Sequence, residues 1–196
     1  MPGTKLWIEV PDFEWIVKNG VFYDITYEHC NYFTKPVLAN LLNKLGFTIR
    51  SFKNVFDSQY LLVEAIFQQE EFTDQKIGTY SLSIQNIDRV FEENKNRFQK
   101  FVEEGESVCV WGASGKGVIF LSELNDIMLR KITYVVDINR EKQGKFLPLT
   151  AKEIKPPETM NGVSSPLSVL IMNGMYSQEI QQTLQRMNIN FQAHVI

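Results

Sequence analysis

The sequence predicts an α/β protein with a parallel sheet in its C-terminal half. Two short apolar runs, residues 107–111 and 132–136, indicate buried strands. A glycine-rich turn from Gly112 to Gly117 follows the first run, and apolar residues at helical spacing fill the stretch before the second. Strand, helix and strand in this order form a βαβ unit, whose strands are parallel. We therefore expect a Rossmann-like domain over residues 106–196.

The remaining elements of this domain follow from the same patterns. Residues 167–172 form another buried apolar run. Ser177 is placed to cap a helix with its own apolar stripe, and residues 191–196 indicate the last strand. His194 in that strand is expected to have a structural role.

Three residues stand at the ends of predicted strands, namely Gly112, Asp137 and Asn173. Open parallel sheets bind ligands outside the carboxyl ends of their strands, so we expect these residues to border one crevice. Asp137 follows the last glycine of the turn by about 20 residues, where a carboxylate would hold a ribose hydroxyl.

The glycine-rich turn supplies further candidate ligands. Its nucleotide-binding candidates are Gly112, Ser114, Gly115, Lys116 and Gly117. Glycines let the backbone approach a phosphate, and a helix N-terminus favours negative charge. Ser114 occupies the place of the middle glycine in the dinucleotide fingerprint. Three interpretations stay open: a tight turn without a ligand, a site for the phosphate of a nucleotide or nucleotide sugar, and a dinucleotide site.

The turn is not a P-loop. Four residues do not separate its Gly-Lys pair from an earlier glycine, and no Ser or Thr follows Lys116. Further along the chain, Lys142, Gln143 and Lys145 either face phosphates or form a solvated loop.

Residues 1–70 predict the closing part of another α/β sheet. The expected elements are a strand at 6–10, an irregular aromatic stretch at 13–33, a helix from Thr34 to Gly46, and a hairpin of strands 47–55 and 60–66. Strand, helix and hairpin in this order are typical of the last third of such a sheet. We expect this segment to be incomplete as a domain.

Residues 71–105 are expected to join the two parts. The polar stretch 67–81 indicates a linker. Apolar residues on one face predict a bridging helix from about 83 to 104.

Composition excludes several classes of protein. A net charge of −3 argues against a nucleic-acid partner, because duplex-binding proteins present a basic face. No apolar run has the length of a membrane span, and the N-terminus is no signal peptide, so we expect a cytoplasmic protein without a membrane partner. Cys30 and Cys109 are expected to be reduced and unpaired, and no metal site is predicted.

Over nearly its whole length the chain resembles the S-adenosylmethionine-dependent sugar C-methyltransferases, and two sets of residues carry this resemblance. The first set comprises residues 7–12, Tyr23, Asp24, residues 27–33 and the helix ending at Gly46, and it is similar to the end of the class I methyltransferase domain. The second set comprises residues 111–117 and 136–145, and it is similar to the Rossmann-like C-terminal domain of the same proteins.

The resemblance implies methyl transfer to the carbon beside the ketone of a nucleotide-linked 4-keto-6-deoxy sugar. It assigns His29 as the base that removes the proton alpha to the carbonyl, with Glu28 beside it and Tyr32 as a third catalytic residue. An imidazole titrates near neutrality, and a neighbouring carboxylate stabilises its charged form. Relatives carry a tyrosine where this chain has Thr26, and Tyr27 and Tyr32 are the alternatives for its role.

Two parts of the family's architecture have no counterpart in this sequence: the zinc-binding module and the loop and acid that hold the methyl donor. We therefore expect the S-adenosylmethionine site to lie mostly outside this chain. Methyl transfer would then require a complementing methyltransferase half. The expected partners are a nucleotide-linked sugar substrate and either that half or further copies of the chain.

Two other functions stay open. The first is a non-catalytic module that binds a nucleotide, a nucleotide sugar or NAD. The second is a scaffold that uses the exposed edge of its N-terminal sheet.

Overall fold

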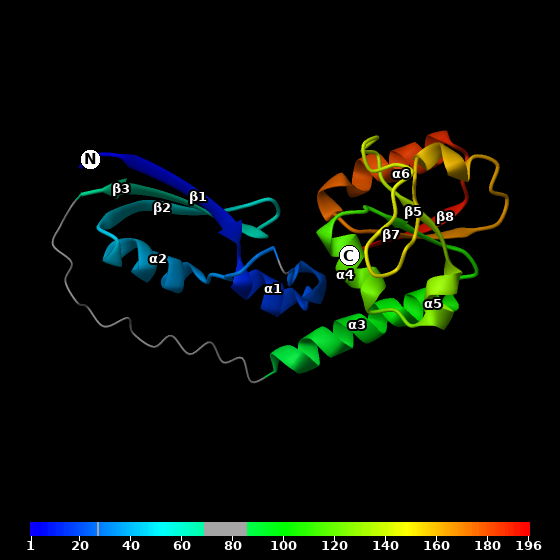
Figure 1. Ribbon diagram of the computed structural model, residues 1–196, viewed down its shortest axis with the longest axis horizontal. Coiled ribbons are helices and arrows are strands. Elements are labelled where there is room, and N and C mark those ends of the chain that lie inside the picture. Colours follow the sequence, from blue (N-terminus) through cyan, green and yellow to red (C-terminus); the bar gives the residue numbers. More distant parts are fainter. Residues whose placement is uncertain (27, 69–85) are drawn as a thin grey trace. The chain divides into compact units, whose positions relative to one another are not determined.

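The computed structural model describes residues 1–26, 28–68 and 86–196. The chain divides into two compact units. The first comprises Met1–Gly20 and Tyr27–Phe91, and the second comprises Val21–Thr26 and Glu92–Ile196. Each unit has its own sheet (Figure 1).

The first unit is a three-stranded antiparallel sheet with a helix packed against it. Its elements are β1 (Lys5–Pro11), α2 (Lys35–Lys44), β2 (Phe47–Val55) and β3 (Tyr60–Phe67). The strand order is β1-β3-β2, so β3 lies between two strands that run parallel to each other. Leu38 and Leu42 of α2 form the core with Val63 and Ala65 of β3. The predicted strands and the helix capped by Thr34 are confirmed.

Residues 13–33, predicted to be irregular, contain the helix α1 (Phe13–Asn19) and the single 3₁₀ turn η1 (Phe22–Asp24). The prediction was wrong for α1 because seven residues span only about two turns, too few for an apolar period to emerge. The ends of the helix are nevertheless specified by their caps. Oδ1 of Asp12 accepts a hydrogen bond from the Glu14 amide at 3.0 Å, and Gly20 ends the helix at φ 65°.

The second unit contains a five-stranded parallel sheet, which confirms the four predicted strands and adds a short edge strand at Ile154–Lys155 that was not predicted. Its strands are β4 (Val108–Trp111), β5 (Ile132–Val136), β6 (Ile154–Lys155), β7 (Leu167–Ile171) and β8 (Phe191–Val195). The strand order is β6-β5-β4-β7-β8. The chain therefore extends the sheet on one side of β4 and then on the other, and the order reverses between β4 and β7.

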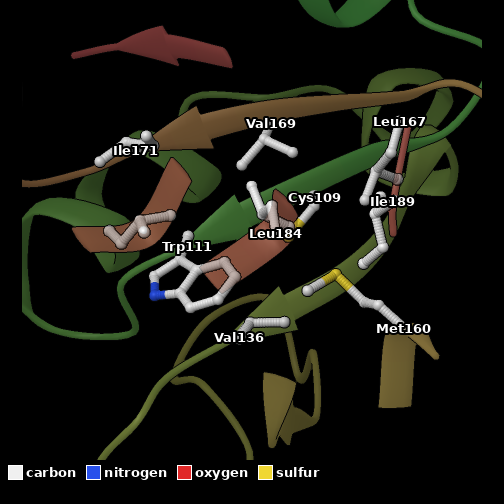
Figure 2. Close-up of a cluster of buried hydrophobic side chains, with 10 residues drawn as sticks. Cys109, Trp111, Val136, Met160, Leu167, Val169, Ile171, Leu184 and Ile189 are labelled. Atoms are coloured by element: carbon white, nitrogen blue, oxygen red, sulfur yellow. The ribbon is translucent and has the colours of Figure 1, made fainter. Parts of the chain in front are cut away.

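Helices cover both faces of this sheet. They are α3 (Ile87–Glu104), α4 (Gly115–Ser122), α5 (Asp126–Lys131) and α6 (Ser177–Arg186), with short 3₁₀ turns η2 (Pro157–Met160) and η3 (Gly174–Tyr176). Side chains alternate along a strand, so Cys109 and Val169 face α6 and pack with its buried Leu184 (Figure 2). On the other face, Phe98 of α3 meets Phe120 of α4 at 6.3 Å between ring centroids.

Two helix predictions differ in detail from the structure. The single helix expected after Gly117 is two helices, because Asn125 accepts a hydrogen bond from the Met128 amide at 2.9 Å and begins α5 there. Ser177, predicted to cap α6, is its first residue, and its hydroxyl accepts a hydrogen bond from Gln181 instead. The predicted linker at 67–81 lies almost wholly outside the described residues.

Asp12 is buried at 7% exposure and joins two elements of the first unit. Besides capping α1, it accepts a hydrogen bond from Nδ2 of Asn54 at 3.1 Å through Oδ2. We expect Asp12→Ala to lower the free energy of unfolding by about 2 kcal/mol, since it removes both the cap of α1 and the hydrogen bond from Asn54. Urea denaturation followed by circular dichroism measures this. Asp57→Asn, at an exposed turn residue, is the control and should change stability by less than about 0.5 kcal/mol.

His194 packs in the second unit as a structural residue. Its ring lies 3.9 Å from that of Phe101 in α3, measured between centroids. Its Nε2 is buried without a hydrogen-bond partner among the described residues. Burial, reinforced by the nearby Arg97 guanidinium, lowers the pKa of His194. The packed contact between α3 and β8 therefore favours the neutral imidazole.

This predicts a pH dependence of stability. The unfolded chain binds a proton at His194 below the ordinary pKa of about 6.5, whereas the folded chain binds it only at lower pH. The contribution of His194 is therefore complete above that pH and declines as the pH falls below it. Urea denaturation between pH 7.5 and 5 should show a shallower slope for His194→Gln than for the wild type. The matched control is His29→Gln, which removes the exposed histidine, and equal slopes for the two variants would contradict the assignment.

Candidate functional site

A cavity of about 270 Å³ lies at the carboxyl edge of the parallel sheet. Its lining residues follow β4, β5 and β7 or belong to α6: Trp111, Gly112, Ser114, Asp137, Ile138, Lys142, Asn173, Tyr176, Glu179, Ile180 and Thr183. The cavity thus lies where the strand order reverses, between β4 and β7. Such switch points are the usual ligand sites of open α/β sheets.

The structure brings four of the predicted nucleotide-binding residues to this cavity. Gly112, Ser114, Asp137 and Asn173 all line it. The other three candidates, Gly115, Lys116 and Gly117, are not among its lining residues.

Two glycines shape the turn between β4 and α4. Gly112 has φ +119°, a conformation that side chains rarely adopt. A Cβ on Gly117 would lie 2.2 Å from the carbonyl oxygen of Gly112, so only glycine allows α4 to begin so close to the end of β4. These are the roles of the first and third glycines in the dinucleotide fingerprint, a tight turn and close helix packing.

Asp137 connects this turn to the end of β5. Its Oδ2 accepts hydrogen bonds from the amide of Ala113 at 2.9 Å and from Nζ of Lys142 at 3.1 Å, and its Oδ1 accepts one from the amide of Asn139 at 2.9 Å. Burial by itself raises the pKa of Asp137, but these hydrogen bonds and the Lys142 charge outweigh it and lower the pKa. The carboxylate is therefore ionised near neutral pH. It keeps acceptor capacity for a ligand hydroxyl, because two carboxylate oxygens offer about four lone-pair positions.

Of the basic stretch that follows β5, Lys142 lines the cavity. Gln143 donates a hydrogen bond from Nε2 to the Asp137 carbonyl oxygen at 2.9 Å, so it holds the backbone of the site. Lys145 is exposed. Of these three residues, only Lys142 is among those that line the cavity.

Six lining residues were not among the candidates of the sequence analysis. Trp111 and Ile138 lie at or just after the ends of β4 and β5. Tyr176, Glu179, Ile180 and Thr183 come from the end of η3 and the first half of α6. Their spacing of three to four residues places them on one helix face. Glu179 and Thr183 make part of that face polar, and they follow the strand end at Asn173 closely in the sequence. This pattern would have indicated them.

Lys116, one of the candidate nucleotide-binding residues, forms an ion pair with Asp24. Its Nζ is 3.0 Å from Oδ1 of Asp24 and 5.9 Å from the ring centroid of Tyr23. A Cβ on the neighbouring Gly115 would meet Thr26 at 3.5 Å. Segment Val21–Thr26 therefore packs against the start of α4 within the second unit.

The predicted catalytic residues belong to the first unit. Glu28 and His29 are exposed, and Tyr32 is half-buried. The rings of His29 and Tyr32 lie 6.0 Å apart in a T-shaped arrangement, and Tyr32 also contacts the ring of Phe13 at 5.7 Å. The imidazole is thus solvent-accessible, with its ring orientation restricted by Tyr32. Tyr27 lies outside the described residues.

A cluster of metal ligands and a membrane-spanning helix are both absent from the part of the chain that the structure describes. There, no three His, Cys, Asp or Glu side chains are placed to share a metal ion. None of the helices there is long and apolar enough to cross a membrane.

A family model described as the C-methyltransferase C-terminal domain matches residues 49–194. The matched region is well over half of the chain and includes every residue that lines the cavity. It begins after Glu28 and His29. No curated protein matches the chain.

The close approach of Gly117 to Gly112 makes a testable prediction. We expect Gly117→Ala to lower the free energy of unfolding by about 2–3 kcal/mol, because the added methyl group meets a backbone carbonyl that cannot move aside without breaking the turn. Gly115→Ala is the matched control, since its methyl group has ordinary contact distance and alanine favours the helix. Thermal denaturation of both variants compares the two costs, and equal costs would refute the packing argument.

Proposed function

Because the chain belongs to the C-methyltransferase C-terminal domain family, we propose that it forms the substrate side of a C-methyltransferase that acts on a nucleotide-linked 4-keto-6-deoxy sugar. In this proposal the cavity binds part of the nucleotide-linked sugar. Glu28 and His29 supply the base, and S-adenosylmethionine supplies the methyl group. The observation that carries the proposal is the cavity at the strand-order switch, with Asp137 at its edge.

The chemistry of the cavity supports a ligand rich in hydroxyl groups. Asp137 and Glu179 offer carboxylate oxygens that accept hydrogen bonds from ribose or sugar hydroxyls. Lys142 is the cation among the lining residues and is suited to a phosphate. Trp111 and Ile180 provide apolar surface. At about 270 Å³ the cavity is just below the usual range for ligand pockets, so it would hold one portion of the substrate.

In the reaction we propose, His29 acts as a general base. Its neutral imidazole takes the proton from the carbon beside the ketone, and the electron pair of that C–H bond moves to form the enolate. Glu28 stabilises the imidazolium that results. We assign no residue of this chain to S-adenosylmethionine, which we propose is held mostly by a complementing methyltransferase half.

A second candidate function is nucleotide binding without catalysis. Gly112 and Gly117 meet the backbone requirements of the dinucleotide fingerprint, and Asp137 stands where a ribose would be held. Ser114, at the place of the middle glycine, is exposed and lines the cavity. Its side chain adds bulk where a dinucleotide requires the closest backbone approach, which favours a smaller nucleotide ligand.

Proton abstraction can be tested without the methyl donor. The chain is incubated in D₂O with a nucleotide-linked 4-keto-6-deoxy sugar, and deuterium at the carbon beside the ketone is followed by NMR. We expect His29→Asn to slow the exchange at least about 100-fold, the usual contribution of a general base, and Glu28→Gln to slow it less. His194→Gln, at the other histidine, should leave it unchanged. Wild-type exchange at the background rate, or full exchange in His29→Asn, would overturn the assignment.

Calorimetry separates the two functions. A pyrimidine nucleoside diphosphate, NAD and S-adenosylmethionine are titrated in turn into the wild-type chain and Asp137→Asn. Binding of the diphosphate that weakens in Asp137→Asn supports the cavity as the nucleotide site. Binding of NAD together with absent proton exchange supports the second function.

A further inference from the structure

The segment Val21–Thr26 is a packed part of the second unit, although the residues on both sides of it belong to the first. Val21 is 3% exposed and Tyr23 is 2% exposed. The ring of Tyr23 meets Phe98 of α3 edge to face at 6.2 Å. Burial of these two apolar side chains stabilises the packed position of the segment.

An ion pair also joins the segment to the start of α4. Nζ of Lys116 lies 3.0 Å from Oδ1 of Asp24, and the side chains of Asp24 and Lys116 are only 16% and 20% exposed. Shielding from water strengthens such a pair relative to a surface salt bridge, and loss of one partner leaves a partly buried charge behind. The same ammonium group lies near the Tyr23 ring, so Lys116 contacts two residues of the segment.

The segment also adjoins the predicted catalytic residues in the sequence. Thr26 lies against Gly115 at the start of α4, and Glu28 follows Thr26 by two residues. Because only one residue separates Thr26 from Glu28, a restraint on residues 21–26 limits the positions that the backbone of Glu28 can take. The restraint originates in the glycine-rich turn of the second unit, at Lys116.

We propose that Tyr23, Asp24 and Lys116 are positioning residues for the Glu28–His29 loop, and that Lys116 serves this loop and not a substrate phosphate. The inference rests on the proposed function of His29 as the base. Lys116 then helps to orient the base. Lys142, which lines the cavity, would bind the phosphate of a nucleotide-linked substrate.

The test uses Asp24→Asn and Lys116→Met, which each break the ion pair with little change in volume, and Lys116→Arg, which keeps the charge. Deuterium exchange into the keto sugar nucleotide gives kcat and KM, and calorimetry gives Kd for a pyrimidine nucleoside diphosphate. Amide hydrogen exchange of residues 21–26 reports on the anchoring itself. Circular dichroism confirms that each variant is folded.

We expect both neutral variants to lower kcat about tenfold, with KM and Kd within about twofold of the wild type. Amide exchange in residues 21–26 should accelerate about tenfold, and Lys116→Arg should restore most of the turnover. The double variant should be no slower than either single variant, because the two residues act as one unit.

Four outcomes would overturn the inference. A tenfold weaker Kd in Lys116→Met but not in Asp24→Asn would make Lys116 a phosphate ligand. Faster amide exchange with unchanged kcat would make the segment a purely structural contact. If the wild type shows no deuterium exchange into the sugar, both the proposed function and this inference are contradicted. If every variant exchanges deuterium into the sugar at the wild-type rate, only this inference is contradicted.

Discussion

The buried carboxylate of Asp137 joins the ends of β4 and β5, which both border the candidate site. It accepts a hydrogen bond from the amide of Ala113 after β4, while its own backbone continues from β5. A buried charge is costly unless every oxygen is paired, and here three donors surround it. The turn and the loop after β5 are consequently fixed relative to each other, and the cavity keeps its shape.

The two lysines near the glycine-rich turn have different environments, and this separates their roles. Lys142 pairs with Asp137 at the cavity. A ligand phosphate there would compete with Asp137 for the ammonium group of Lys142. Lys116 pairs with Asp24, away from the lining residues. Sequence proximity to glycines is therefore a poor guide to which lysine meets a ligand, because the direction of a side chain at a helix start depends on what packs beside it.

The chain passes from the first unit to the second and back again within its first 27 residues. Residues 21–26 separate α1 from the Glu28–His29 loop along the chain, yet they are part of the second unit. The family match covers the second sheet and its cavity but begins after the Glu-His pair. The matched region therefore includes the residues that line the cavity, whereas the catalytic pair lies outside it and is assigned by the sequence resemblance.

The sequence by itself determined the parallel sheet, because each of its central strands is a short apolar run and Gly112 and Gly117 mark a turn that only a βαβ unit requires. It also placed Gly112, Asp137 and Asn173 at one edge, since residues that follow parallel strands must lie together. It did not reveal α1, whose capping by Asp12 outweighs a weak apolar period, nor the break at Asn125.

Only the tertiary structure decided the partners of the site. Glu179 and Thr183 reach the cavity because α6 packs over β7, and Asp24 meets Lys116 because η1 packs on α4. Such pairings join residues far apart in the chain, and no local pattern records them. Their physical basis is burial of aromatic and aliphatic side chains, which sets the position of each element before any polar pair can form.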